Sequence, residues 1–294
     1  MQMQNQAKAY LLASIVVLFW ATAASAFKLS LRFLNTIELL FYSSLTATVV
    51  LFIIILFRNK IGIIRSYTVK DFTFSALLGF MNPFLYYLIL FKAYSLLPGQ
   101  IAQSLNFVWP IMIVLFSIPI LKQKLSLKRF LAIFVSFLGV ILISTQGNFS
   151  GLKINNPMGV GLALSSSIIW AFFFVVNARD KHDEECKLFL SFLFGTIFIS
   201  FLYIPKFSFP PLYGLLGAIY VGIFEMGIAF VFWIRALKLS RTTAQVSNLV
   251  YLTPFLALFF LRIFVGEKIL ISTIVGIILI ISGILFQRKI KDKS

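Results

Sequence analysis

The sequence has little charge and almost none of the side chains that form disulfides or metal centres. Charged residues make up 12% of the 294 residues, about half the share of an ordinary soluble domain. The single cysteine, Cys186, excludes an internal disulfide. Cys186 and the single histidine, His182, lie in a polar run without CxxC or HExxH spacing. We therefore expect a charged loop there, and no metal or cofactor site.

Apolar residues dominate the chain instead. They make up 60% of it and give a mean hydropathy of +0.99. This composition excludes a soluble enzyme, a disordered tail protein and a fibrous repeat, and it predicts an integral protein of a lipid bilayer. Ten spans of about 20 residues would occupy most of the chain, so we expect no separate soluble domain.

Ten apolar runs are bounded by charges or turn residues, and each is close to the length of a membrane-spanning helix. Because the runs are continuous rather than alternating, they predict an all-α fold and not a membrane barrel. The first run ends in Ala24-Ser25-Ala26, which imitates a signal-peptide cleavage site, but it is long enough to span and we expect it to be retained. The runs are 9–28, 37–57, 72–91, 102–121, 129–146, 158–178, 188–204, 211–234, 243–262 and 270–286.

The positive charges indicate an orientation. The net charge is +17, and if all ten runs span, 19 of the 26 Lys and Arg lie on the side of the N-terminus. Since cytoplasmic loops carry an excess of Lys and Arg, both termini are predicted to be cytoplasmic, in a bacterial cytoplasmic membrane. The positive residues are scattered at the ends of the runs, so we expect no nucleic-acid binding.

The second half of the chain echoes the first in residue order. Short matches occur in the same order in both halves and predict repeats of five helices over 1–146 and 147–294. An odd number of spans turns the second copy the opposite way in the membrane, and such inverted repeats are typical of transporters. The matches are Trp20-Ala21 with Trp170-Ala171, Ala102-Gln103 with Ala244-Gln245, Pro110 with Pro254, and Gly139 with Gly283.

Further short motifs accompany the repeat. They are Leu18-Phe19-Trp20-Ala21, Trp170-Ala171, Pro254 followed by Gly266-Glu267-Lys268, and Gly276 with Gly283. Together with the five-plus-five arrangement, they resemble the EamA-like branch of the drug/metabolite transporter superfamily over residues 8–290. The resemblance implies ten helices and the export or exchange of small metabolites, often amino acids. The chain has Lys122-Gln123-Lys124 where the family often has Gly-Glu, so a symmetric pair of carboxylates is not expected there.

Glu225, near the middle of the eighth run, is the sharpest functional signal. An ionised carboxylate at that depth costs about 2.5–3.5 kcal/mol on insertion scales, and such residues mark ion or substrate paths. We hypothesise that Glu225 binds a proton, a substrate amine, or each in turn. The alternative is a structural carboxyl group that is hydrogen-bonded between helices. Asn82 aligns with Glu225 across the repeat and is a second candidate at the same depth.

Amide side chains and prolines mark further candidate positions in the spans. A proline inside a helix removes a backbone hydrogen bond, and broken backbone at depth is tolerated where it lines a cavity. We therefore predict helix breaks near a binding site, with kinks and interhelical amide bonds that only aid packing as the alternative. The amides are Gln103, Asn106, Gln245 and Asn248, and the prolines are Pro83, Pro110 and Pro254.

Aromatic residues make up 17% of the chain, including 35 Phe, and most are expected to face lipid or the core. Four are deep and adjacent to polar or proline positions, which makes them candidates for a cage around an organic cation or an aromatic ring. Structural packing is the alternative for each of them. The four are Trp20, Trp170, Tyr87 and Trp109.

Charged residues at the span ends are interpreted as interfacial anchors and ion pairs. Those at the first and last external turns are Lys28, Arg32, Glu38, Arg262, Glu267 and Lys268.

Two rival classes fit the sequence less well than a carrier. Intramembrane proteases need histidine or paired aspartate at depth, which the runs do not provide, and no Gly-rich phosphate motif indicates ATP as the driving force. A channel would need a ringed filter, whereas a two-fold repeat with one acidic residue at depth fits a carrier.

The sequence thus predicts a secondary active transporter and not an enzyme. It would export or exchange a small metabolite by alternating access between the repeats, with an amino acid as the first choice and with protons as the coupling ion. The alternative is an exporter of cationic or aromatic drugs, and the oligomeric state stays open.

Overall fold

The computed structural model describes residues 2–121, 127–148, 154–177, 180–241 and 246–289. All regular secondary structure in these ranges is helical, as predicted. Seven helical stretches in them are long and apolar enough to cross a bilayer, and shorter apolar helices lie at Ile133–Ser144 and Ile271–Phe286. The all-helical membrane fold is therefore confirmed, while the number of ten spans stays a prediction.

The first half of the chain forms α-helices that are interrupted once by a π-helical turn, η1. In chain order, the elements are α1 (Gln2–Ser30), α2 (Thr36–Phe57), α3 (Ile61–Arg65), α4 (Val69–Gly79), η1 (Phe80–Leu85), α5 (Tyr86–Leu96), α6 (Gly99–Asn106), α7 (Trp109–Leu121) and α8 (Leu127–Ser144).

The second half contains more irregular helical turns than the first. In chain order, the elements are α9 (Pro157–Asn177), α10 (Glu184–Tyr203), η2 (Ile204–Lys206), α11 (Leu212–Tyr220), η3 (Val221–Gly227), α12 (Ile228–Leu239), η4 (Asn248–Leu252), α14 (Thr253–Phe260), η5 (Leu261–Val265) and α15 (Ile271–Lys289). The turns η2 and η4 are 3₁₀-helical, and η3 and η5 are π-helical.

Side-chain caps fix where several of these helices begin. Asn35 and Glu38 form a capping box at the start of α2, and Thr68 and Asp71 form another at α4. At α10 the carboxylate of Asp183 accepts from the backbone N–H groups of the second and third helical residues. These caps satisfy N–H groups that have no partner within the helix.

Two long spans, Val69–Leu96 and Leu212–Leu239, each carry a π-helical turn near the middle. In η1 the turn contains Pro83, which lacks an N–H, and Asn82 departs from helical geometry with φ −147° and ψ 120°. In η3, Gly222 permits close approach to α2, since a Cβ there would lie 2.5 Å from the carbonyl oxygen of Ser43. Pro83 therefore accounts for the break in η1, and Gly222 lets η3 pack directly against α2.

The turn between α5 and α6 is held by two charged side chains from distant parts of the chain. Lys28 Nζ donates to the carbonyl oxygens of Tyr94 and Leu97, each at 2.9 Å, at the C-terminal end of α5. Glu267 accepts from the first two backbone N–H groups of α6, at 2.6 and 3.1 Å. The cation lies at a helix C-terminus and the anion at a helix N-terminus, so each interacts favourably with the helix dipole. Both residues were expected to be interfacial anchors, and both also make hydrogen bonds within the protein.

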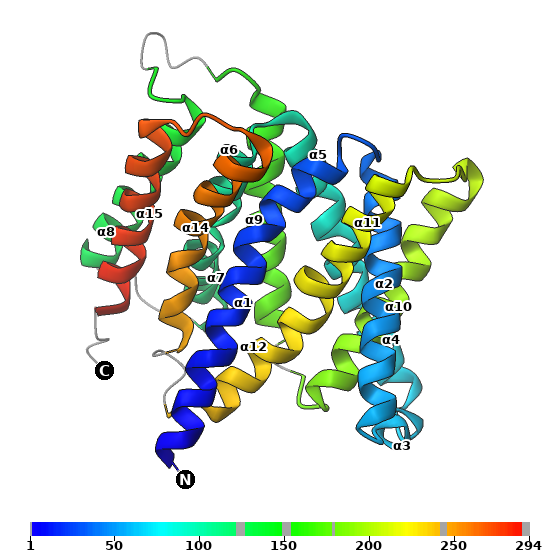
Figure 1. The fold of residues 1–294 in the computed structure, drawn as a ribbon. Coiled ribbons are helices and arrows are strands. Elements are labelled where there is room, and N and C mark those ends of the chain that lie inside the picture. The colour runs from blue at the N-terminus through cyan, green and yellow to red at the C-terminus, as the bar shows by residue number, and fades with distance from the viewer. Residues whose placement is uncertain (1, 122–126, 149–153, 178–179, 242–245, 290–294) are drawn as a thin grey trace.

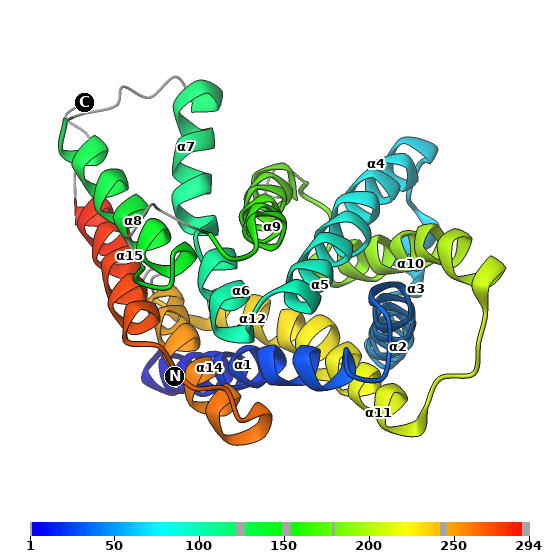
Figure 2. The same ribbon diagram turned by 90° about the horizontal axis from the view of Figure 1, so that it is seen from above.

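The helices surround a central region in the view from above. There α1, α5, α6, α9 and α12 lie around the centre, with α8 and α15 at one edge and α2, α4, α10 and α11 on the opposite side (Figure 2). In the side view, α1 begins and α15 ends toward the same face of the bundle (Figure 1). This face also carries the end of α9 and the start of α10.

The pair α8 and α15 makes a contact that depends on glycine. A Cβ at Gly139 would lie 2.5 Å from the carbonyl oxygen of Gly276 on the other helix. Small residues at such an interface let two membrane helices approach backbone to backbone.

We expect Gly139→Ala to destabilise the protein by about 1–3 kcal/mol, because the added methyl group overpacks the contact between α8 and α15. The measurement is the thermal unfolding midpoint of the purified protein in detergent. Gly161→Ala is the matched control. A Cβ at Gly161 on α9 meets open space, so alanine there should be neutral or stabilising through its helix propensity. Equal midpoints for the two variants would contradict the assigned contact.

Candidate functional site

A cavity of about 450 Å³ lies among α1, α5, α6, α7, α9, α10, η3, α12, η4 and α14. One end is lined by residues at the ends of α9, α10 and α12, and we call this end the mouth. The mouth residues are Asn177, Asp180, Glu184, Lys187 and Lys238. The side chains of Glu184 and Lys238 are partly exposed, at 39% and 63%, so the mouth reaches the surface. The cavity has a volume typical of small-molecule sites.

Aromatic rings form most of the cavity wall beyond the mouth. Trp20 on α1 lies against Trp233 on α12, with ring centroids 5.3 Å apart. Trp170 on α9 contacts Phe230 at 5.7 Å and Tyr86 at 5.0 Å. All four tryptophans of the chain line this one cavity. Such a wall suits a ligand with an apolar or aromatic body, and it also stabilises cations over ring faces.

Glu225 lies on the cavity lining in η3, near the middle of the span Leu212–Leu239. The phenol of Tyr87 donates a hydrogen bond to Oε1 of Glu225 at 3.2 Å. The other carboxylate oxygen, Oε2, is buried and has no hydrogen-bond partner among the described residues. A carboxylate with an unsatisfied buried oxygen can bind a proton or a cation.

Two neighbouring tyrosines on α5 make separate hydrogen bonds to Asn106 on α6 and to Glu225. Asn106 donates from Nδ2 to Ser166 Oγ at 2.9 Å and accepts at Oδ1 from the phenol of Tyr86 at 3.3 Å. Tyr86 is followed by Tyr87, which reaches the carboxylate of Glu225. The amide of Asn106 and the carboxylate of Glu225 are thus positioned by adjacent tyrosines on α5.

The structure brings seven of the predicted site residues to this cavity. They are Glu225, Gln103, Asn106, Trp20, Trp170, Tyr87 and Trp109. Gln103 also accepts a hydrogen bond of 2.5 Å from Tyr94.

Other predicted residues lie away from the cavity. Asn82 is fully buried in η1 but is not on the lining, and neither amide atom has a partner among the described residues. Asn248 in η4 is exposed, while its neighbours Val250 and Thr253 reach the cavity. Gln245 lies outside the described residues.

The three predicted prolines each lie at an irregular point of the helical structure, although none of them lines the cavity. Pro83 is inside η1 and packs against Gly195 of α10. Pro110 is the second residue of α7, which begins after the break at residues 107–108. Pro254 is the second residue of α14, which follows the 3₁₀ turn η4.

Several lining residues were not identified from the sequence. Trp233 and Phe230 on α12 complete the aromatic wall, and Thr253 adds a buried hydroxyl that has no partner among the described residues. Lys187 and Ser191 are four residues apart on α10, so they share a face of that helix. That spacing was the available signal, but Lys187 was counted only as one of the positive charges at the run ends.

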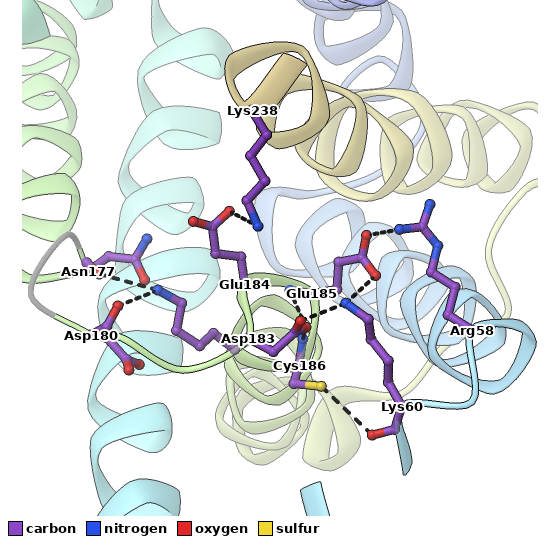
Figure 3. A network of polar contacts seen from close by, with 10 residues as sticks. Arg58, Lys60, Asn177, Asp180, Asp183, Glu184, Glu185, Cys186 and Lys238 are labelled. Atoms are coloured by element: carbon purple, nitrogen blue, oxygen red, sulfur yellow. Dashed lines mark hydrogen bonds and ion pairs between the residues drawn. The ribbon is translucent and has the colours of Figure 1, made fainter. Parts of the chain in front are cut away.

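Figure 3 shows a network of charged side chains at the face of the mouth. Glu184 turns toward Lys238 on α12, and Glu185 turns the other way, toward Arg58 and Lys60. The Nζ of Lys60 lies 2.6 Å from Asp183 and 3.0 Å from Glu185, and Arg58 forms an ion pair with Glu185. The network fastens the start of α10 to the end of α2.

These contacts shift two ionisable groups in opposite directions. Burial acts to lower the pKa of Lys60, but its bonds to Asp183 and Glu185 outweigh burial and raise the pKa above its ordinary value. Burial acts to raise the pKa of Asp183, but Lys60 and the backbone of Cys186 lower it below its ordinary value. Each charge therefore stabilises the other.

The fold and the cavity define a multi-pass membrane protein with a site of small-molecule size. The sequence profile of the EamA-like transporter family matches residues 7–145 and again residues 157–287, and the chain belongs to this family. The family resemblance read from the motifs is confirmed. Family and relatives indicate a membrane transporter rather than an enzyme.

Relatives and a solved structure agree with this assignment. A protein of Archaeoglobus fulgidus named an uncharacterized transporter is 25% identical over 283 residues, covering 94% of this chain and 96% of the relative. The uncharacterized transporter YyaM of Bacillus subtilis is 25% identical over 252 residues, covering 81% and 80%. A crystal structure with 20% sequence identity superposes with a TM-score of 0.66 over 95% of each chain, which shows the same fold.

We expect Lys60→Met to lower the thermal unfolding midpoint at pH 7, by an amount equivalent to about 1 kcal/mol for a partly exposed pair. Because Lys60 depresses the pKa of Asp183, the pair stabilises the fold above the unfolded pKa of Asp, about 3.9, and the contribution is lost as the pH falls through the lower folded pKa. The deficit should therefore shrink toward pH 3. Lys70→Met removes an exposed ammonium and is the control. A deficit that does not change with pH would refute this account.

Proposed function

We propose that the chain is a secondary active carrier that exports or exchanges a small metabolite, with an amino acid as first choice, in exchange for protons. The observation that carries the proposal is Glu225, a mid-span carboxylate on a cavity wall whose one hydrogen bond among the described residues comes from Tyr87. Its unsatisfied Oε2 is stabilised by binding a proton or a substrate ammonium. Binding the two in turn would couple their movements in opposite directions.

The proposal includes ten spans in two inverted repeats, residues 1–146 and 147–294. Two features support it. The family profile matches the chain twice in succession, once in each half. The span α4–η1–α5 and the span α11–η3–α12 are each 28 residues long and each interrupted by a π-helical turn. Repeats of opposite orientation give two similar packings, which is what alternating access requires.

We place both termini in the cytoplasm of a bacterium. The excess of Lys and Arg on that side supports this orientation. The mouth of the cavity lies on the face where α1 begins and α15 ends, so in this orientation the cavity opens inward, where an exported metabolite would enter.

A carrier of cationic or aromatic compounds is the second candidate. The aromatic wall favours it, because four tryptophans and a single mid-span carboxylate would also suit an organic cation with a ring. An amino acid differs from such a compound by its carboxylate, so the two candidates are separated by the choice of substrate panel.

We expect Glu225→Gln to abolish proton-driven transport. Without an ionisable group at that site, a pH gradient has no carrier for the proton through the cavity. The measurement is movement of amino acids and of cationic dyes in proteoliposomes under an imposed pH gradient. Glu38→Gln is the matched control, because it makes the same change in the capping box of α2, where glutamine also serves.

Each outcome has a definite meaning. Movement of amino acids that is lost in Glu225→Gln supports the first proposal, and movement of dyes alone supports the second. Transport by Glu225→Gln with unchanged pH dependence would show that Glu225 is structural.

A further inference from the structure

Lys187 is a buried cation on the cavity lining. It lies in the first turn of α10, and only 6% of it is exposed. Its Nζ donates to the backbone carbonyl oxygens of Asp180 at 2.9 Å and Asn177 at 3.5 Å. An ammonium group has three N–H donors, so these two neutral acceptors leave one donor for a ligand.

The carboxylates near Lys187 have other partners. In the part of the chain that the structure describes, no ion pair joins a carboxylate to Lys187. Glu184 pairs with Lys238, Glu185 and Asp183 pair with the basic residues that follow α2, and Asp180 lies 2.6 Å from His182. A buried cation without an ionised partner costs free energy, and an anionic ligand would offset that cost.

The cavity therefore presents opposite charges at different depths. Lys187 lies at the mouth, Ser191 follows one turn further along α10, and the carboxylate of Glu225 lies in the middle of its span. We propose that Lys187 is an entry subsite that binds the carboxylate of a substrate whose amine then reaches Glu225. The substrate class is an amphoteric small molecule with an apolar or aromatic body. This inference rests on the carrier function proposed above.

A purely structural role for Lys187 makes a different prediction. Asn177 is the last residue of α9, so a cation at its carbonyl also stabilises that helix end. Loss of a helix cap would weaken the transport of every substrate to the same degree. Loss of a carboxylate subsite would weaken only the substrates that carry a carboxylate.

The test is Lys187→Gln, which removes the charge but keeps N–H donors for the two carbonyls. The probes are radiolabelled phenylalanine and phenethylamine, which share the ring and the amine and differ by the carboxylate. We expect the half-saturation concentration for phenylalanine to rise about tenfold, the usual effect of losing a charge-assisted hydrogen bond, and that for phenethylamine to change less than about twofold.

Three further variants make the test specific. Lys181→Gln removes an exposed charge from the same loop and should leave both substrates unchanged. Lys187→Arg keeps the charge and should keep the preference for phenylalanine. Lys187→Met is a second variant without the charge, to be used if Lys187→Gln does not fold.

The outcomes separate this inference from the carrier proposal. Equal weakening of both substrates would overturn the subsite and leave a helix cap. Wild-type transport of phenethylamine but not phenylalanine would overturn the subsite while preserving a carrier of cations. If the wild-type protein moved neither compound under a pH gradient, the subsite for a substrate with an aromatic body would be overturned, and the panel of amino acids and dyes above would decide the carrier proposal separately.

Discussion

Every backbone polar group inside a bilayer needs a partner within the protein, and this constraint governs where the chain departs from regular helix. The helical structure is irregular at η1, at residues 107–108 between α6 and α7, and at η3, η4 and η5. Two of these departures carry lining residues directly, Glu225 in η3 and Val250 in η4, and a third follows Asn106. Three of these five irregular points therefore lie at the cavity, whereas η1 and η5 do not reach its lining. Elsewhere, capping boxes and the side chains of Lys28 and Glu267 satisfy the helix ends.

Packing explains why a cavity remains at the centre of the bundle. Where glycines meet, as at Gly139 and Gly276, two helices approach until their backbones touch. Around the cavity, large rigid rings from α1, α5, α9 and α12 meet instead. Such rings contact one another at 5–6 Å between centroids but do not fill the space between their helices. Tight glycine contacts at the periphery and bulky rings inside thus produce a stable wall around an open centre.

The sequence identified polar residues whose burial in a membrane costs free energy. It did not identify residues whose role depends on which face of a helix lines the cavity. Glu225 was found because a carboxylate at depth is expensive, and Asn106 because an amide and a proline occur one turn apart. Asn82 was chosen because it aligns with Glu225 across the repeat, which predicts the same depth in the membrane. Asn82 lies in the π-helical turn η1 and is not on the cavity lining. Trp233 was missed, since a helix that is apolar all round has no periodicity to show which side faces the cavity. Lys187 was missed because a positive charge at the end of a run is interpreted first as an interfacial anchor. Ten spans and the orientation in the membrane are properties of the protein with its bilayer, and they stay predictions.

The network that fastens α10 also encloses the only sulfhydryl group of the chain. Cys186 is fully buried, and its Sγ lies 3.9 Å from the carbonyl oxygen of Lys60. A thiol reagent added to the folded protein therefore meets no accessible native cysteine. Any cysteine introduced along the cavity wall can therefore be labelled without a contribution from Cys186. The accessibility of the wall from each side of the membrane can thus be mapped residue by residue without first removing a native thiol.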